Sequence, residues 1–183
     1  IIGHEIMHGL VAYKYGDSTA KDAGRLSVNP LVHVDLVGTI LVPAILFLIN
    51  SPFLFGWAKP VPVNMWTVVR NGGYGGAIAV SLAGIIYNFC LALIASSVLP
   101  FISVSDTMSY ALYGICYFAV VYNVVLAVFN LWPLPPLDGS NALGYIGRAL
   151  GTSKIDEFNM RYGQYGTIVL MILIATPLSK FFL

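Results

Sequence analysis

Charged side chains are scarce in this 183-residue sequence. Only 9% of the residues are Asp, Glu, Lys or Arg, about a third of the share in soluble domains, whereas 58% are hydrophobic. The nine Lys and Arg residues are scattered, so they form no basic patch of the kind that a nucleic-acid-binding protein needs. The shortage of charge therefore excludes a soluble domain and predicts an all-α polytopic membrane protein with no nucleic-acid partner.

Cysteine is rarer still, and internal repeats are absent. Cys90 and Cys116 lie in apolar runs without the short spacing of a metal or redox motif, so we interpret both as small packing residues. No period of 20 to 50 residues recurs, which excludes a repeat architecture.

We expect residues 1–183 to form one domain. Because His4 has three residues before it and a spanning helix needs about 20, we also expect the first helix to begin upstream.

Long apolar runs are what the sequence has instead. About four spanning helices are predicted: one that ends near residue 14, and others at 77–101, 108–132 and 163–183. The apolar stretch 36–56 is long enough to span, but prolines and Asn50 interrupt it, so it either spans or re-enters on the same side.

The polar connections carry weaker signals. We interpret residues 17–35 as a surface loop with one or two short strands near the active site, and Arg70–Gly76 as a flexible link. The prolines in 57–64 exclude a helix interior and favour an extended backbone there.

The strongest local signal is His4-Glu5-Ile6-Met7-His8. Two imidazoles four residues apart lie on one helix face and can bind one Zn²⁺, and the intervening Glu5 can act as a general base. A catalytic zinc needs a third protein ligand, and most candidates lie in polar loops or linkers, where a solvated side chain is the simpler interpretation: Asp17, Asp22, His33, Asp35, Asp106, Asp156 and Glu157. Asp138 differs because it follows a proline-broken helix at the membrane, where an ionisable residue indicates function.

Two motifs 130 residues apart are more specific than either alone. Residues 130–139 match the pattern NxxPxPxLDG at every fixed position, and HEIMH matches HExxH. Between them, GWAKPVPVN at 56–64 and AGIIYN at 83–88 are similar to GWAKPVPVN and AGPxxN, with Ile85 in place of the usual Pro. Over nearly its whole length the chain resembles the site-2 protease family of intramembrane zinc metalloproteases, in the subgroup that lacks a PDZ domain.

The resemblance implies a role for each matched residue. His4, His8 and Asp138 would bind one Zn²⁺ per chain, Glu5 would be the catalytic base, and Asn130 would hold the substrate carbonyl or the oxyanion.

Three further residues are candidates beside this site. Asn88 would be a polar neighbour of the metal, with helix packing as the equal alternative. The extended segment around Val61 and Val63 could pair with an unwound substrate strand, which is our hypothesis for substrate binding.

The predicted function is that of a zinc metalloendopeptidase that cuts a peptide bond in or near a transmembrane segment of a substrate protein. A membrane zinc transporter or sensor is the alternative, and an inactive scaffold is a third possibility.

If 36–56 re-enters, eight basic residues share one face, which the positive-inside rule places in the cytoplasm. We therefore expect a multi-pass protein of the bacterial cytoplasmic membrane, whose active site opens to the cytoplasm and whose partners are lipid, the substrate and a regulatory membrane protein.

Overall fold

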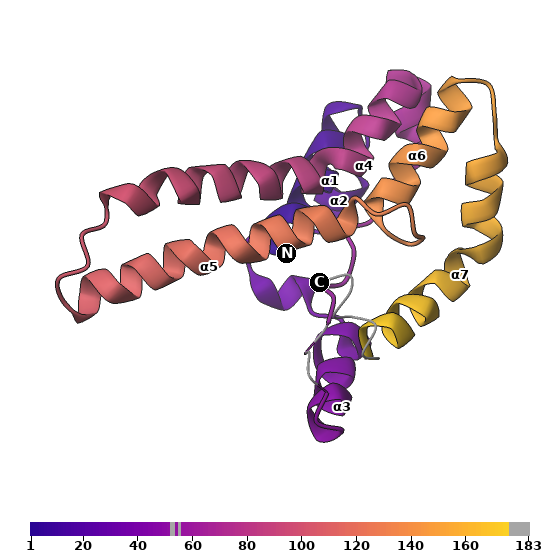
Figure 1. Ribbon diagram of the computed structural model, residues 1–183. Helices are drawn as coiled ribbons and strands as arrows, with labels where there is room; N and C mark the ends of the chain where they lie inside the picture. The colour runs from indigo at the N-terminus through magenta and orange to yellow at the C-terminus, as the bar shows by residue number, and fades with distance from the viewer. Residues whose placement is uncertain (52–53, 55, 176–183) are drawn as a thin grey trace.

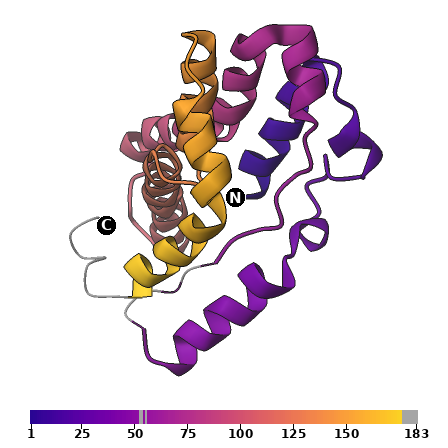
Figure 2. The same cartoon turned by 90° about the vertical axis from the view of Figure 1, so that its right-hand side faces the viewer.

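The computed structural model describes residues 1–51, 54 and 56–175. Every regular element within these residues is helical, and Figures 1 and 2 show their arrangement. In chain order the elements are α1 (Ile2–Lys14), α2 (Thr19–Asp22), the 3₁₀ turn η1 (Pro30–His33), the π-helix η2 (Leu36–Leu41), α3 (Val42–Leu48), α4 (Met65–Val98), the 3₁₀ turn η3 (Leu99–Phe101), α5 (Thr107–Asn130), α6 (Asp138–Ala149) and α7 (Lys154–Ala175).

The long antiparallel pair α4 and α5 is the largest feature of the fold (Figure 1). Among the described residues, Met65–Phe101 and Thr107–Asn130 are the two helical stretches that are long and apolar enough to cross a membrane. Asp106 caps α5, because its carboxylate accepts from the Ser109 N–H at 2.8 Å while the Ser109 hydroxyl accepts from the Asp106 N–H at 3.0 Å. The sequence predicted both helices as spans.

The start of α4 differs from the sequence prediction. The helix begins at Met65, twelve residues before the expected 77, and it kinks at Gly73, whose φ is 62°. The expected flexible link 70–76 is therefore helical. A Cβ atom on Gly72 would lie 2.4 Å from the Tyr15 ring, so that glycine permits close packing against the end of α1 and does not provide flexibility.

No residue between 17 and 35 or between 57 and 64 is in a strand, so the short strands expected near the active site are not found. The first region instead holds α2 and η1. Residues 57–64 are extended but form no strand ladder with another described segment. The apolar stretch 36–56 forms η2 and α3, a helical run that is too short to span a bilayer. The predicted last span, 163–183, overlaps α7, which begins earlier, at Lys154, and its residues 176–183 lie outside the described part.

The core sits where α1 packs along α4. Ala12, Val68 and Val80 are buried there, and Val11, Tyr15, Val63 and Met65 pack around them. This contact holds the HEIMH helix against the middle of α4, and α6 packs against α4 as well. Two helices from distant parts of the sequence thus approach the same region of α4.

Candidate metal centre

His4 and His8 lie one turn apart on α1 and present their rings to the same point. Their Nε2 atoms are 3.2 Å apart, and the ring planes are inclined at 76°. His4 is buried and His8 half-buried. The helical spacing predicted from the sequence therefore produces a convergent pair of nitrogen donors.

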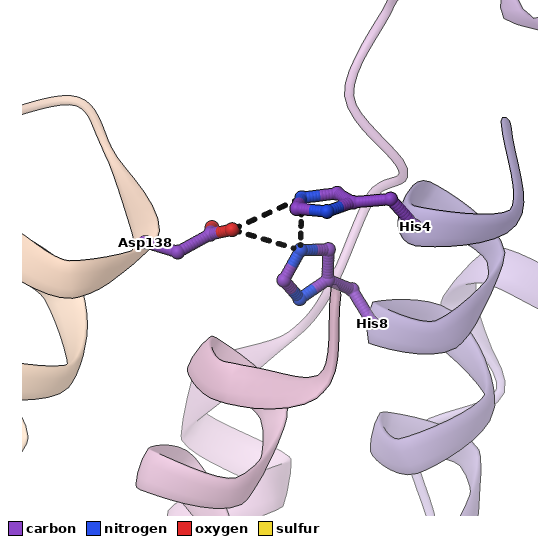
Figure 3. A group of neighbouring side chains, drawn as sticks. All are labelled: His4, His8 and Asp138. Atoms are coloured by element: carbon purple, nitrogen blue, oxygen red, sulfur yellow. Dashed lines mark hydrogen bonds and ion pairs between the residues drawn. The ribbon is translucent and has the colours of Figure 1, made fainter. Parts of the chain in front are cut away.

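Asp138, the first residue of α6, completes the group (Figure 3). Its Oδ2 atom lies 3.0 Å from His4 Nε2 and 3.3 Å from His8 Nε2. Oδ2 is buried and has no hydrogen-bond donor among the described residues. A cation bound between this oxygen and the two imidazole nitrogens would satisfy it.

The spacing of these three atoms fits a zinc ion. Tetrahedral ligands at about 2.0–2.2 Å from Zn²⁺ lie about 3.3–3.6 Å from one another. The three observed separations, 3.2, 3.0 and 3.3 Å, are within about 0.3 Å of that range. Three protein ligands leave a fourth position open, which is the arrangement of catalytic rather than structural zinc sites.

A proline-rich turn brings Asp138 to the histidines. Leu137 is buried against Phe129, Trp132 and Leu134, which anchors the turn to the end of α5. A Cβ atom on Gly139 would lie 2.1 Å from the Leu131 carbonyl oxygen, so only glycine lets α6 start so close to that turn. Leu137 and Gly139 on either side of Asp138 are therefore required by packing.

Helix α4 supplies the outer partners of both imidazoles. His8 Nδ1 donates to the Val80 carbonyl at 2.7 Å, and His4 Nδ1 lies 3.1 Å from Asn88 Nδ2. Gly84 lies between these two positions, where a Cβ would be 2.5 Å from the His4 ring. The missing side chain thus makes room for His4.

These contacts determine which ring nitrogens face the metal. A histidine that binds a cation through Nε2 carries its proton on Nδ1, so that nitrogen must donate. For His8, the Val80 carbonyl is the acceptor of the Nδ1–H. For His4, the Asn88 side chain must present its oxygen, and Oδ1 is a buried atom with no donor of its own among the described residues. Rotation of the Asn88 amide by 180° exchanges its oxygen and nitrogen, so that Oδ1 accepts from the His4 Nδ1–H and both atoms gain a partner.

Glu5 is held by the extended segment. Its Oε2 accepts a hydrogen bond from the Val61 N–H at 2.9 Å, and both residues line the same cavity as the two histidines. The contact orients the carboxylate and leaves Oε1 free of that bond.

The segment that holds Glu5 is itself fixed at several points. The Trp57 N–H donates to the Gly38 carbonyl at 3.1 Å, and the Lys59 N–H donates to the His33 carbonyl at 2.9 Å. The Arg25 guanidinium donates to the Lys59 carbonyl at 2.5 Å. His33, which we expected at the surface, is 2% exposed and bonds the Ser27 carbonyl through Nε2, because the segment covers it.

Asp17 fixes the far end of the segment. It accepts from the Asn64 N–H at 2.6 Å, from the Thr19 N–H at 3.0 Å and from the Thr19 hydroxyl. Burial alone would raise the pKa of Asp17, but these hydrogen bonds outweigh it and hold the pKa below its ordinary value of 3.8. The ionised carboxylate is thus a structural acceptor at the end of α1.

A cavity of about 630 Å³ opens beside these groups. Its walls include every residue that the sequence singled out: His4, Glu5, His8, Val61, Val63, Asn88, Asn130 and Asp138. Asn130 is half-buried, and its Nδ2 donates to the Leu126 carbonyl of its own helix at 2.9 Å. The sequence did not point to the Val80 carbonyl, since a backbone acceptor leaves no side-chain signal, and it included Gly84 in a motif without assigning it a role.

Comparison with known proteins agrees with this geometry. The sequence model of peptidase family M50 matches residues 100–174. The protein named "Putative zinc metalloprotease YwhC" of Bacillus subtilis is 37% identical over 98% of this chain and 78% of its own length. Two proteins named "Putative zinc metalloprotease Rip2" are each 27% identical, one from Mycolicibacterium smegmatis and one from Mycobacterium tuberculosis, and the chain covers 65% and 62% of their lengths.

No solved structure matches this chain. The identity to YwhC extends over nearly all of the chain, from the HEIMH helix through the LDG turn to α7. The sequence prediction of the family, of its zinc cofactor and of a hydrolase is therefore confirmed. The chain is a membrane-associated zinc metalloprotease that belongs to peptidase family M50, the site-2 protease family.

Proposed function

We propose that this protein is an intramembrane endopeptidase, which hydrolyses a peptide bond in or near a transmembrane segment of another protein. The depth of the site carries the proposal. Asn88 lies 11 residues after Ala77, where the apolar run of α4 starts, which corresponds to about 16 Å along the helix. Because His4 contacts Asn88, the metal centre lies beside the middle of a span whose hydrocarbon layer is about 30 Å thick.

The residues of the cavity have separate tasks in this reaction. The bound Zn²⁺ supplies a Lewis acid. Glu5, oriented through Oε2 by the Val61 N–H, accepts a proton from the attacking water at Oε1. Asn130 donates one N–H of its amide to the Leu126 carbonyl. Its second N–H stabilises the negative charge that develops on the substrate carbonyl oxygen.

The extended segment is the proposed binding strip for an unwound substrate. The Trp57 and Lys59 N–H groups bond to the protein, and the Val61 N–H bonds to Glu5. The Val63 N–H makes no hydrogen bond among the described residues, so it is the donor that remains for pairing with a substrate. Val61→Pro would remove the donor to Glu5, so its effect would not isolate strand pairing. Val63→Pro is the sharper test, and we expect it to impair cleavage with zinc content unchanged.

The proposed topology has the cavity open to the cytoplasm. The turn between α4 and α5 lies at one end of the long helix pair (Figure 1). Arg70, over the Trp66 ring, lies near the start of α4 at the other end, and Arg25 bonds the carbonyl of Lys59 in the segment that leads into this helix. The re-entry of η2 and α3 on that same side keeps the basic residues together.

The decisive experiment compares wild type, Glu5→Gln and a chelator-treated sample on reconstituted single-span substrates. We expect cleavage by the wild type alone, with about one zinc per chain in both the wild type and Glu5→Gln, since Glu5 is not one of the three grouped ligand residues His4, His8 and Asp138. Cleavage that survives Glu5→Gln contradicts the mechanism. Zinc uptake into vesicles without cleavage by the wild type would favour the transporter alternative.

A further inference from the structure

One face of α6 continues the polar lining beyond the metal. Asp138, Asn141 and Tyr145 all line the cavity, at spacings of three and seven residues that place them on one side of the helix. Side chains three residues apart on a helix have Cβ atoms about 5–6 Å from each other. The amide of Asn141 is therefore the polar group that follows the metal ligand along this wall.

Asn141 has no assigned task, unlike three other polar residues of the cavity. Ser81 donates to the Ala77 carbonyl, Asn130 donates to the Leu126 carbonyl, and Asn88 contacts His4. The side chain of Asn141 is exposed and makes no hydrogen bond within the described residues. Asn141 lines the cavity, and no hydrogen bond within the described residues uses its amide oxygen or its two N–H groups.

The chemistry of the cavity indicates which ligand this amide suits. Much of the lining is apolar, and the neighbouring wall contributes Ala58 and Pro60, of which the proline has no N–H to donate. An unwound substrate brings peptide N–H and C=O groups into this space, where a group left without a hydrogen-bond partner is unfavourable. A primary amide carries both a donor and an acceptor, so it complements a peptide group.

We propose that Asn141 is a substrate-binding residue, whose side-chain amide bonds one backbone peptide group of the unwound substrate close to the scissile bond. The inference rests on the proposed function and adds a contact that does not depend on the extended segment. Tyr145, half-buried one turn further along α6, borders the next substrate residue.

The test uses the full chain in lipid and a single-span peptide that the wild type cleaves and Glu5→Gln does not. Asn141→Ala and Asn141→Leu are compared with Asn123→Ala, which removes a half-buried amide bonded to its own helix at the Ala119 carbonyl, away from the cavity. We expect kcat/KM to fall about tenfold in both Asn141 variants, the worth of one desolvated hydrogen bond, and to stay within twofold in Asn123→Ala. Zinc content should be unchanged in all three.

A backbone scan of the substrate separates contact from structure. Peptide bonds around the scissile position are replaced one at a time by esters, which removes a single N–H. One ester should reduce cleavage by the wild type and have no added effect in Asn141→Ala. Equal kcat/KM for Asn141→Ala and Asn123→Ala, or the same ester penalties in both enzymes, overturns the inference while the protease function stands. Zinc-loaded wild type that cleaves no peptide overturns both.

Discussion

Asn88 provides the sharpest test of how the metal centre is held. Replacing it by Ala leaves the His4 Nδ1–H without an acceptor, in a position that is fully buried. An unsatisfied buried donor costs about 1–3 kcal/mol. Loss of an outer partner of a metal-binding histidine weakens metal affinity about 10- to 100-fold, or about 1.4–2.7 kcal/mol. The two figures agree, so we expect Asn88→Ala to bind zinc 10 to 100 times more weakly.

Asn88→Asp distinguishes an acceptor from a donor at this position. An ionised carboxylate can only accept, so it should restore zinc affinity to within a few-fold of the wild type if the amide oxygen faces His4. If the amide nitrogen were the contact, Asn88→Asp would bind as weakly as Asn88→Ala. Affinity is measured by competition with a chromogenic chelator in detergent, with Asn123→Ala as the matched control. Affinity within twofold of the wild type for Asn88→Ala would refute the reasoning.

Three further predictions follow from separate parts of the structure. Gly84→Ala should reduce zinc affinity more than tenfold, because its Cβ would lie 2.5 Å from the His4 ring, whereas Gly114→Ala, with nothing within 4 Å, should not; equal affinities for the two would contradict this. Asp17, whose pKa is held below 3.8, stabilises the fold above that pH and loses this contribution as the pH falls through its folded pKa. In Asp17→Asn the thermal midpoint should therefore be lower than in the wild type at pH 7, and it should change less as the pH falls below 4. Parallel curves of thermal midpoint against pH for the two proteins would show that the charge of Asp17 is unimportant. Asn50→Cys should react with an impermeant thiol reagent from the cytoplasmic side only, and labelling from the opposite side would refute re-entry.

The sequence predicted the long helices well because their apolar runs are nearly continuous. The expected bounds 77–101 and 108–132 include most of the apolar part of α4 and α5. The start of α4 was wrong for a specific reason: clustered glycines are typical of flexible links, and only the fold shows that Gly72 packs against Tyr15. Likewise, the loop 17–35 has the composition of a surface segment, whereas His33 is buried and its carbonyl bonds Lys59, which is distant in sequence.

The site was predictable in unequal parts. Helical periodicity is enough to place His4 and His8 on one face. The sequence singled out Asp138 by its position after a proline-broken helix at the membrane, and the family resemblance implied that it is a ligand, but its proximity to the histidines depends on how the turn after Asn130 packs. Asn141 follows Asp138 at a helical spacing, so the pattern could have identified it once α6 was assigned. The Val80 carbonyl could not be identified in this way, since every residue has one.

The register of two helices explains why these pieces work together. Val80, Gly84 and Asn88 repeat every four residues on α4, as His4 and His8 do on α1, so each imidazole meets a matching position. This four-residue spacing is kept because α4 is regular at Ile85; its kink lies twelve residues earlier, at Gly73. One residue inserted after Gly84 would rotate Asn88 by about 100° away from His4 and leave the contact of His8 with Val80 intact. The outer partners of the metal centre are therefore specified by the spacing along α4 as much as by the residues themselves.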